Sequence, residues 1–520
     1  MNEPTEVDGV PLHVIEMTGE PGDVILCHPF FWHTTSSNVL DYPRFMRTKD
    51  VKTEEFLFLL LFLSIFNLLF LSSSLYFVLR TPHSKRIIPM PSNTYTSPTI
   101  KRQADAGCPV TGLGAEFNPF GEPYLSDPYA FYIRARTEEP VFYSPEIDHW
   151  VITRYEDVRA ILHDPATFSS KMAQSPIKPW PEKAMEMFNA RQFDIRPFLS
   201  NNDPPSHTQV RQFLRNAFTP GKIKWLEPVV REIVVTEIER IADWGKADLV
   251  KELFYETPAR VLFAFLGIPD GEVNKIKAWS KGRGLLTWGN PSDEEILTLM
   301  PNFIEYLQYC FGHVDALEKN PGDDYISELL KQLKEEKTEG VTKSMIVLAL
   351  FGLLMAGHET TSNQASNGFR ALLKHREDWD AVSKSPTLIP NAVEEMIRYE
   401  SSVISWRRVT NKPVKIAGVE IPKDAQLLVM LAAANRDEAH FEDGEHFDIR
   451  RANAQQHMSF GHGIHYCLGA PLARLELHIL LEELSRCLPT LRLVEGQSYD
   501  YLPNTTHRGP SSLWVAWDVE

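Results

Sequence analysis

The chain has 520 residues, of which 43% are hydrophobic and 11% aromatic, and its formal net charge is −16. This apolar content is enough for a sizeable core, and the length allows about three domains, or one large enzyme domain with smaller pieces beside it. The acidic balance argues against nucleic acid as a partner, because phosphate binding requires a basic face.

Five cysteines are spread along the chain, at positions 27, 108, 310, 467 and 487. No Cys-x-x-Cys pair occurs, so the pattern argues against a zinc site or a disulfide framework and favours reduced thiols. One cysteine alone still suffices as a metal ligand where a prosthetic group supplies the other ligands.

Residues 1–50 are polar, apart from a short strand-like stretch at 24–26. The segment 19–47, GEPGDVILCHPFFWHTTSSNVLDYPRFMR, resembles the C-terminal end of phytanoyl-CoA-dioxygenase-like enzymes, which use non-haem iron and 2-oxoglutarate. That resemblance makes His33 the distal iron ligand and pairs Arg44 with the 2-oxoglutarate carboxylate. Such a site needs two histidines and a carboxylate, and no His-x-Asp/Glu pair precedes His33. We therefore expect a non-functional dioxygenase-like fragment, left by a relic, a fusion or a mis-joined gene model.

Residues 56–79 form a run of 24 residues without a charge, with basic residues flanking both ends. As a helix this run would span roughly 36 Å, more than the ~30 Å hydrocarbon core of a bilayer, and it starts too late for a secretory signal. We predict a transmembrane helix whose orientation the flanking charges leave open. A buried core helix and a translation artefact are the alternatives. The stretch 80–106 is a linker by its proline, serine and threonine content, and residues 107–520 have a globular composition.

A helix is predicted after Asp203-Pro204-Pro205, because the two prolines break the chain just before it. His207 and Arg211 in this helix are four residues apart and therefore share a face.

Residues 345–357 carry no charge and are apolar on all sides, which predicts a buried helix. The run turns polar at 358–367, so Gly357, Glu359 and Thr360 are expected in mid-helix, where glycine and threonine are unfavourable. A threonine hydroxyl there can bond a backbone carbonyl and open the helix, and such local widening is often functional.

The segment 390–401, PNAVEEMIRYES, predicts another helix that begins near Pro390. Glu395 and Arg398 are three residues apart and share one face of this helix. By itself such a pair is typical of a solvated surface.

The segment 458–477, MSFGHGIHYCLGAPLARLEL, carries the strongest signal. Leucine and isoleucine repeat at helical spacing after Cys467, which predicts a helix, and glycines at 461, 463 and 469 let the backbone approach a flat ligand closely. A cysteine just before a helix start meets unpaired N–H groups and the positive end of the dipole. We therefore expect a lowered thiol pKa and a thiolate at this position.

The pattern Phe460-x-x-Gly463-x-His465-x-Cys467-x-Gly469 resembles the haem-binding loop of cytochromes P450 at every defining position. The resemblance covers about the last four hundred residues. It implies a cytochrome P450 fold, mainly α with a smaller β region, around a buried haem b whose axial iron ligand is Cys467.

Two strand-like stretches, 142–155 and 414–431, are expected to form the β region. Within the family, the segments 139–158 and 501–518 are similar to the haem domain of bacterial self-sufficient monooxygenases, which continue into a reductase. No reductase follows here, so we expect a separate electron-transfer protein. It would pass electrons from NAD(P)H through a reductase or a ferredoxin.

The resemblance also assigns residue roles. It makes Thr360 a hydrogen-bond partner of dioxygen at the iron, and Glu359 a relay for protons. The haem itself would contact Phe460, Gly461, Gly469, Ala356 and Gly357. Its propionates would be clamped by His207, Arg211, Arg408 and His465.

Glu395 and Arg398 become, in this resemblance, a buried structural pair behind the haem that holds the cysteine loop. A downstream arginine completes the pair, either Arg451 or, as a near alternative, Arg450.

The implied function is that of a haem-thiolate monooxygenase. It would insert one atom of dioxygen into a mostly apolar small-molecule substrate and release the other atom as water. The alternatives are a haem-binding sensor, a peroxide-using haem enzyme, and a non-haem dioxygenase built on residues 1–50. The substrate pocket is expected to involve residues 185–198, 353–356, 403–406 and 502–506. The enzyme would be membrane-tethered if the helix at 56–79 is real, and cytoplasmic otherwise.

Overall fold

The computed structural model describes residues 5–7, 10–12, 110–215, 220–336 and 340–519. The chain divides into two compact units, residues 1–90 and 91–520. In the first unit, two short strands, β1 (Thr5–Val7) and β2 (Val10–Leu12), pair antiparallel. The predictions for His33, Arg44, the transmembrane helix and the linker concern residues outside the described ranges.

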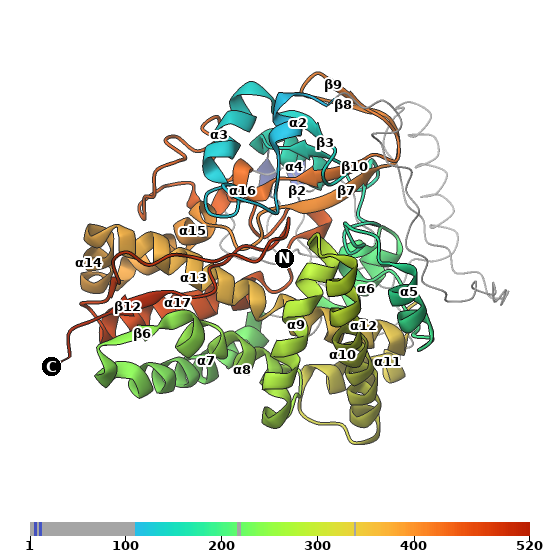
Figure 1. The fold of residues 1–520 in the computed structure, drawn as a ribbon. Coiled ribbons are helices and arrows are strands. Elements are labelled where there is room, and N and C mark those ends of the chain that lie inside the picture. Colours follow the sequence, from blue (N-terminus) through green and yellow to red (C-terminus); the bar gives the residue numbers. More distant parts are fainter. Residues whose placement is uncertain (1–4, 8–9, 13–109, 216–219, 337–339, 520) are drawn as a thin grey trace. The chain divides into compact units, whose positions relative to one another are not determined.

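The second unit is mainly helical (Figure 1). Its earlier helices are α2 (Gly112–Glu116), α3 (Tyr129–Glu138), α4 (Tyr155–His163), α5 (Glu182–Asn189), α6 (Ser206–Arg215), α7 (Pro220–Ile241), α8 (Glu256–Phe265) and α9 (Val273–Trp288). The later helices are α10 (Asp293–Lys319), α11 (Tyr325–Glu336), α12 (Lys343–Ala356), α13 (Glu359–Lys374), α14 (Arg376–Lys384), α15 (Ile389–Tyr399), α16 (Leu431–Ala434) and α17 (Ala470–Cys487). The helices predicted after Pro205, near Pro390 and after Cys467 correspond to α6, α15 and α17.

The main sheet has the strand order β3-β4-β10-β7-β5. Its strands are β3 (Val141–Ser144), β4 (His149–Ile152), β5 (Phe168–Ser169), β7 (Trp406–Thr410) and β10 (Gln426–Val429). β10 runs parallel to β4, and the other neighbouring strands of this sheet are antiparallel. Leu428 in β10 stands opposite Val151 on one side and Arg407 on the other, which fixes the register of β7 beside the site.

Two smaller sheets complete the β region. One has the order β11-β12-β6 and the other is a hairpin of two strands. Their strands are β6 (Lys246–Asp248), β8 (Val414–Ile416), β9 (Val419–Ile421), β11 (Arg492–Leu493) and β12 (Trp514–Ala516). Both strand-like stretches predicted from the sequence contain paired strands, so the prediction of a mainly helical fold with a smaller β region is confirmed.

α12 lies in the core because its surface is apolar on every side. It packs against α9, α10 and α11, while α13 packs against α15 and α17. Among the described residues, the stretch 343–374 formed by α12 and α13 is long and apolar enough to cross a membrane. Most of its apolar part is buried inside the folded unit, as expected of a core helix.

Candidate active site

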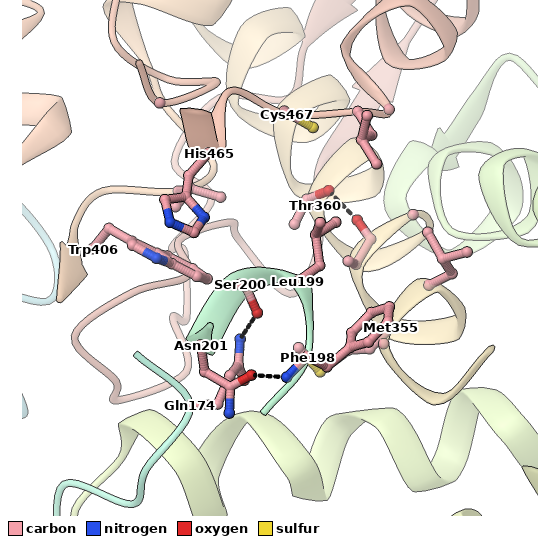
Figure 2. Close-up of a pocket in the computed structure, with 18 of the residues that line it drawn as sticks. Gln174, Phe198, Leu199, Ser200, Asn201, Met355, Thr360, Trp406, His465 and Cys467 are labelled. Atoms are coloured by element: carbon pink, nitrogen blue, oxygen red, sulfur yellow. Dashed lines mark hydrogen bonds between the residues drawn. The ribbon is translucent and has the colours of Figure 1, made fainter. Parts of the chain in front are cut away.

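A cavity of about 440 Å³ lies between the junction of α12 with α13 and the loop that precedes α17. Cys467 from the loop and Thr360 from the start of α13 both line it. Figure 2 shows Cys467 and Thr360 near one end of this cavity, with His465 and Trp406 along one side. Two segments far apart in the sequence therefore present a sulfur atom and a hydroxyl group to one cavity.

Backbone hydrogen bonds within the loop before α17 hold its shape. The Cys467 amide donates to the Phe460 carbonyl at 2.9 Å, and the Tyr466 amide donates to the Gly463 carbonyl at 3.0 Å. Gly463 has a φ of +68°, and a Cβ there would lie 2.6 Å from the Leu162 carbonyl oxygen. Only glycine suits this position, because both the backbone conformation and the close approach exclude a side chain.

The Cys467 thiol faces the cavity at the N-terminus of α17. Although Cys467 is exposed at the cavity surface, desolvation by the surrounding protein atoms raises the pKa of its thiol, and this outweighs the hydrogen bonds from the Gly469 and Ala470 amides and the charge of Arg211, which lower it. The expectation of a lowered pKa is therefore wrong for the free thiol, because desolvation of the sulfur costs more than the helix terminus returns. A metal cation at the sulfur would reverse this balance, since metal binding deprotonates a coordinating thiol.

Arg408 is a buried cation at the edge of the cavity. Its Nη1 donates to the Arg407 carbonyl at 2.8 Å, and it forms no ion pair with any carboxylate in the described part of the chain. Burial lowers its pKa to about 10, and Asp203 is the carboxylate that opposes this shift. Asp203 is itself occupied by hydrogen bonds from Ser169 and Ser170. Arg408 therefore retains donors and a positive charge that an anionic group could satisfy.

His207 and His465 stand together beside Arg408, with ring centroids 4.1 Å apart. Burial and the neighbouring arginines lower their pKa values to about 4 and about 2, so both rings are neutral at neutral pH. His465 Nε2 is 2.9 Å from the Ser170 hydroxyl. Both nitrogens of the His207 ring are buried, and neither has a hydrogen-bond partner among the described residues.

Arg211, Arg408 and His465 line the cavity, and His207 lies behind them. Arg211 comes from α6 and donates to the Tyr466 carbonyl at 2.6 Å, which joins this group to the cysteine loop. Arg211 and Arg408 are cations with spare donors, and the buried His207 ring has no hydrogen-bond partner among the described residues. Such a group suits a ligand that carries two carboxylates next to a metal. The haem propionates have this chemistry, so the residues present fit haem b.

The central helix is broken at the cavity. α12 ends at Ala356 and α13 begins at Glu359, so Gly357 and Glu359 lie at a junction rather than in mid-helix as predicted. The Thr360 hydroxyl donates to the Ala356 carbonyl at 2.5 Å, a bond drawn in Figure 2. Ala356, Gly357 and Thr360 line the cavity, but Glu359 does not. Glu359 instead bonds Tyr255, whose pKa it raises together with burial.

The predicted structural group comes together behind the loop. Arg398 donates to both carboxylate oxygens of Glu395 at 2.7 Å, and both side chains are fully buried. Arg451 donates to the same carboxylate at 3.3 Å. Of the two arginines left open by the sequence, Arg450 lies on the surface and pairs with Asp378 at 3.4 Å.

Two further polar contacts tie this group to the cysteine loop, and sequence reasoning missed both. Arg398 donates to the Asn435 carbonyl at 2.7 Å, and Asn435 accepts from the Met458 amide at 2.5 Å. Arg474 forms two bonds to Glu394, at 2.6 and 2.9 Å. Glu394 adjoins Glu395 in the middle of α15, and this second acid beside the predicted pair was the available signal.

The cavity lining differs from the expected pocket in one segment. Lining residues come from 185–198, 353–356 and 403–406 as predicted, but none comes from 502–506. His507 lines the cavity in place of that segment. Sequence reasoning also missed the last two turns of α9, which contribute Arg283, Thr287 and Trp288.

Cys467 lies alone at a helix terminus, Thr360 lines the same mainly apolar cavity, and Arg211 and Arg408 offer donors to an anion beside the cysteine. These features together define a class, the haem-thiolate proteins. A family model and sequence relatives match this chain. The family model described as "Cytochrome P450" matches residues 303–487. Cytochrome P450 monooxygenase PikC of Streptomyces venezuelae is 34% identical over 419 residues, which are 79% of this chain and 95% of that protein. The chain thus belongs to the cytochrome P450 family.

Solved structures agree. Cytochrome P450 CREJ in complex with (4-ethylphenyl) dihydrogen phosphate is 39% identical, with a TM-score of 0.75, over 78% of this chain and all of that chain. An intact type IV self-sufficient cytochrome P450 monooxygenase is also 39% identical, with a TM-score of 0.75, over 82% of this chain and 55% of the other. The predicted likeness to self-sufficient enzymes is confirmed. Relatives are named as monooxygenases and hydroxylases, and this chain is a cytochrome P450 monooxygenase.

Proposed function

We propose that the chain inserts one atom of dioxygen into a mostly apolar organic substrate, with haem b held through Cys467. The observation that carries this proposal is that Cys467 and Thr360 line one cavity whose other walls are mainly apolar. When bound, the haem supplies the activation of dioxygen, and the protein contributes orientation, protons and the exclusion of water. The aromatic ligand of the solved relative CREJ supports an organic substrate of modest size.

Thr360 and Glu359 are proposed to manage protons. Reduction of one oxygen atom to water consumes two protons, so a route for protons must reach an otherwise apolar cavity. The Thr360 hydroxyl stands at the cavity wall, bonded to Ala356. Glu359 is the adjacent residue and faces Tyr255, on the side away from the cavity. We assign Glu359 the intake of protons and Thr360 their delivery. A protein that only binds ligands at haem needs neither group.

The remaining residues are proposed to bind and hold the cofactor. His207, Arg211, Arg408 and His465 would hold the propionates, while Phe460, Gly461 and Gly469 would shape the loop around the sulfur. Each charge-assisted bond of this kind is worth about 1.5–3 kcal/mol. Glu395, Arg398 and Arg451 would hold the loop from behind. The two arginines donate to backbone carbonyls of the segment before it, and Glu395 accepts from a backbone amide of that segment.

Electrons are proposed to come from NAD(P)H through a separate reductase or ferredoxin. The chain covers 55% of the intact self-sufficient relative but 97% of the isolated haem domain of the Tepidiphilus thermophilus P450, which supports a separate reductase. The division into a dioxygenase-like fragment at 1–50, a transmembrane helix at 56–79, a linker at 80–106 and a haem domain at 107–520 stays a prediction. Membrane tethering and a cytoplasmic location remain the two alternatives that it leaves open.

A carbon-monoxide difference spectrum of the reduced full chain tests the proposal. We expect the red-shifted Soret band of a thiolate-ligated haem, lost in Cys467→Ala. Cys487→Ala is the matched control, because Cys487 is a partly buried cysteine at the far end of the same helix, α17. The control should keep the band. A band typical of histidine ligation that survives Cys467→Ala would refute the assignment.

A further inference from the structure

Arg283 is a buried arginine in the wall of the cavity, on α9. Its side chain is 8% exposed. Nη1 donates to the Phe351 carbonyl of α12 at 2.8 Å, and the guanidinium carbon lies 4.1 Å from the centroid of the Phe351 ring. Phe351 thus uses one donor and one face of the guanidinium, and the Tyr306 hydroxyl accepts a further hydrogen bond from it. An arginine has five N–H donors in a rigid fork, so further donors are left for another partner.

The charge of Arg283 is not balanced by an ion pair. No carboxylate in the described part of the chain forms a salt bridge with it, and no Asp or Glu occurs among the described residues that line the cavity. Burial has the largest effect on the pKa of Arg283 and lowers it. The charge of Glu359 raises this pKa, but it is the weakest of the contributions. A buried unpaired cation is costly, and an anion that enters the cavity would remove that cost.

The other cavity-lining arginines have different surroundings. Arg211 and Arg408 come from α6 and β7 and stand beside the cysteine loop, where they fit the propionates. Arg196 pairs with Asp194 at 3.0 Å and is more exposed. Of these four arginines, Arg283 alone is deeply buried, lies on α9 and has no assigned anion.

Polar groups converge on the same place. Thr287 lies one helical turn after Arg283 on α9, so both side chains share a face, and both line the cavity. His507 lines it as well, and the charge of Arg283 contributes, after burial, to lowering the His507 pKa to about 4. The imidazole is therefore neutral near neutral pH and offers one N–H donor. A guanidinium, a hydroxyl and an imidazole together suit a tetrahedral or planar oxyanion.

We propose that Arg283, Thr287 and His507 form an anion subsite that binds a carboxylate or phosphate monoester at one end of the substrate. This inference rests on the proposed function and narrows its substrate class to apolar molecules with one anionic end. Phe351, which Arg283 contacts, lies in α12 nine residues before Thr360, and Thr360 lies in α13 beyond the break of the central helix. The anionic end would therefore sit remote from the reacting carbon, and oxidation would occur at the opposite end of the molecule.

The test is ligand binding to the full-chain holoenzyme, measured by calorimetry and by the change of the Soret band on titration. The probes are two matched pairs, decanoate with decanamide and 2-naphthyl phosphate with 2-naphthol. We expect at least one acid to bind about ten-fold or more tightly than its neutral partner. Arg283→Gln should abolish that preference while the neutral partner still binds, and Arg283→Lys should restore part of it. The pair that shows the preference distinguishes a carboxylate from a phosphate ligand.

Arg196→Gln serves as the comparison variant, because Arg196 also lines the cavity but already has an acidic partner. A preference kept in Arg283→Gln and lost in Arg196→Gln would overturn the assignment, as would equal binding of acid and neutral partner in both pairs. The carbon-monoxide spectrum of each variant distinguishes failure of the anion subsite from failure of the proposed function. A thiolate-type band without any acid preference rejects the subsite alone, whereas absence of that band in the unmodified chain rejects the proposed function.

Discussion

The guanidinium of Arg398 is bonded to both carboxylate oxygens of Glu395 at 2.7 Å, and neither side chain has any exposed surface. Arg398 also donates to the backbone carbonyls of Asn435, Gly444 and His446. The pair therefore links α15 to the segment that leads into the cysteine loop. Removing one partner would leave an uncompensated charge in the interior.

Glu395→Gln is expected to lower the free energy of unfolding by about 3–5 kcal/mol, because the Arg398 charge loses its partner in a buried environment. Urea unfolding followed by circular dichroism measures this change. Glu420→Gln is the control, since Glu420 pairs with Lys415 at 3.0 Å on the exposed surface. Such a pair is worth no more than about 1 kcal/mol. Equal effects of the two substitutions would contradict a structural role for Glu395.

Arg408→Gln is expected to weaken haem retention by roughly 10- to 100-fold, corresponding to the loss of one charge-assisted bond. The rate of haem transfer to an excess of an apo-globin measures it. Arg450→Gln should retain haem normally, because Arg450 is a surface arginine paired with Asp378. Unchanged haem transfer in Arg408→Gln would remove Arg408 from the propionate clamp.

Thr360→Val is expected to lower the amount of product formed per NAD(P)H consumed by about 100-fold, because the cavity loses the hydroxyl that delivers protons. The carbon-monoxide spectrum should stay that of a thiolate-ligated haem. Thr298→Val is a matched control. Its hydroxyl also donates to the carbonyl four residues earlier, at 2.9 Å, but on the exposed face of α10. Normal coupling in Thr360→Val would show that another group carries the protons.

Glu476 in α17 predicts a pH dependence of stability. Both of its carboxylate oxygens are buried without a hydrogen-bond partner among the described residues, and burial raises its pKa from 4.5 to about 8. The folded chain therefore holds a proton that the unfolded chain has released between about pH 4.5 and 8. The free energy of unfolding should fall as pH rises through this window, by about 2–4 kcal/mol.

Glu476→Gln should remove this component and be more stable than the unmodified chain at about pH 8, while the two differ little at about pH 5. Urea unfolding at several pH values compares the two proteins. Parallel pH profiles would mean that Glu476 has a partner in solution that keeps it ionised.

Much of the local structure could be predicted from patterns of residues that lie close together in the sequence. The glycines and the cysteine before α17, the apolar run of α12 and the proline at the start of α15 each act through neighbouring backbone, so their spacing is visible in the sequence. The loop around Cys467 adopts positive φ at Gly461 and Gly463, as the expectation of close backbone approach requires.

Relations between distant segments depended on the fold. Arg450 and Arg451 are adjacent in sequence, yet only Arg451 contacts Glu395, because the direction of each side chain is set by how the segment packs on α15. Glu359 and Thr360 are neighbours as well, but a helical step of about 100° turns one toward Tyr255 and the other into the cavity.

By itself, the sequence determined the family, the candidate iron ligand and the helices around it, because these are encoded in short patterns with local physical causes. Only the tertiary structure decided which buried charges are balanced. It left Arg408 and Arg283 facing the cavity without an ion pair to any described residue, and it raised the pKa of the Cys467 thiol. Desolvation and electrostatic compensation depend on what packs nearby and not on sequence spacing.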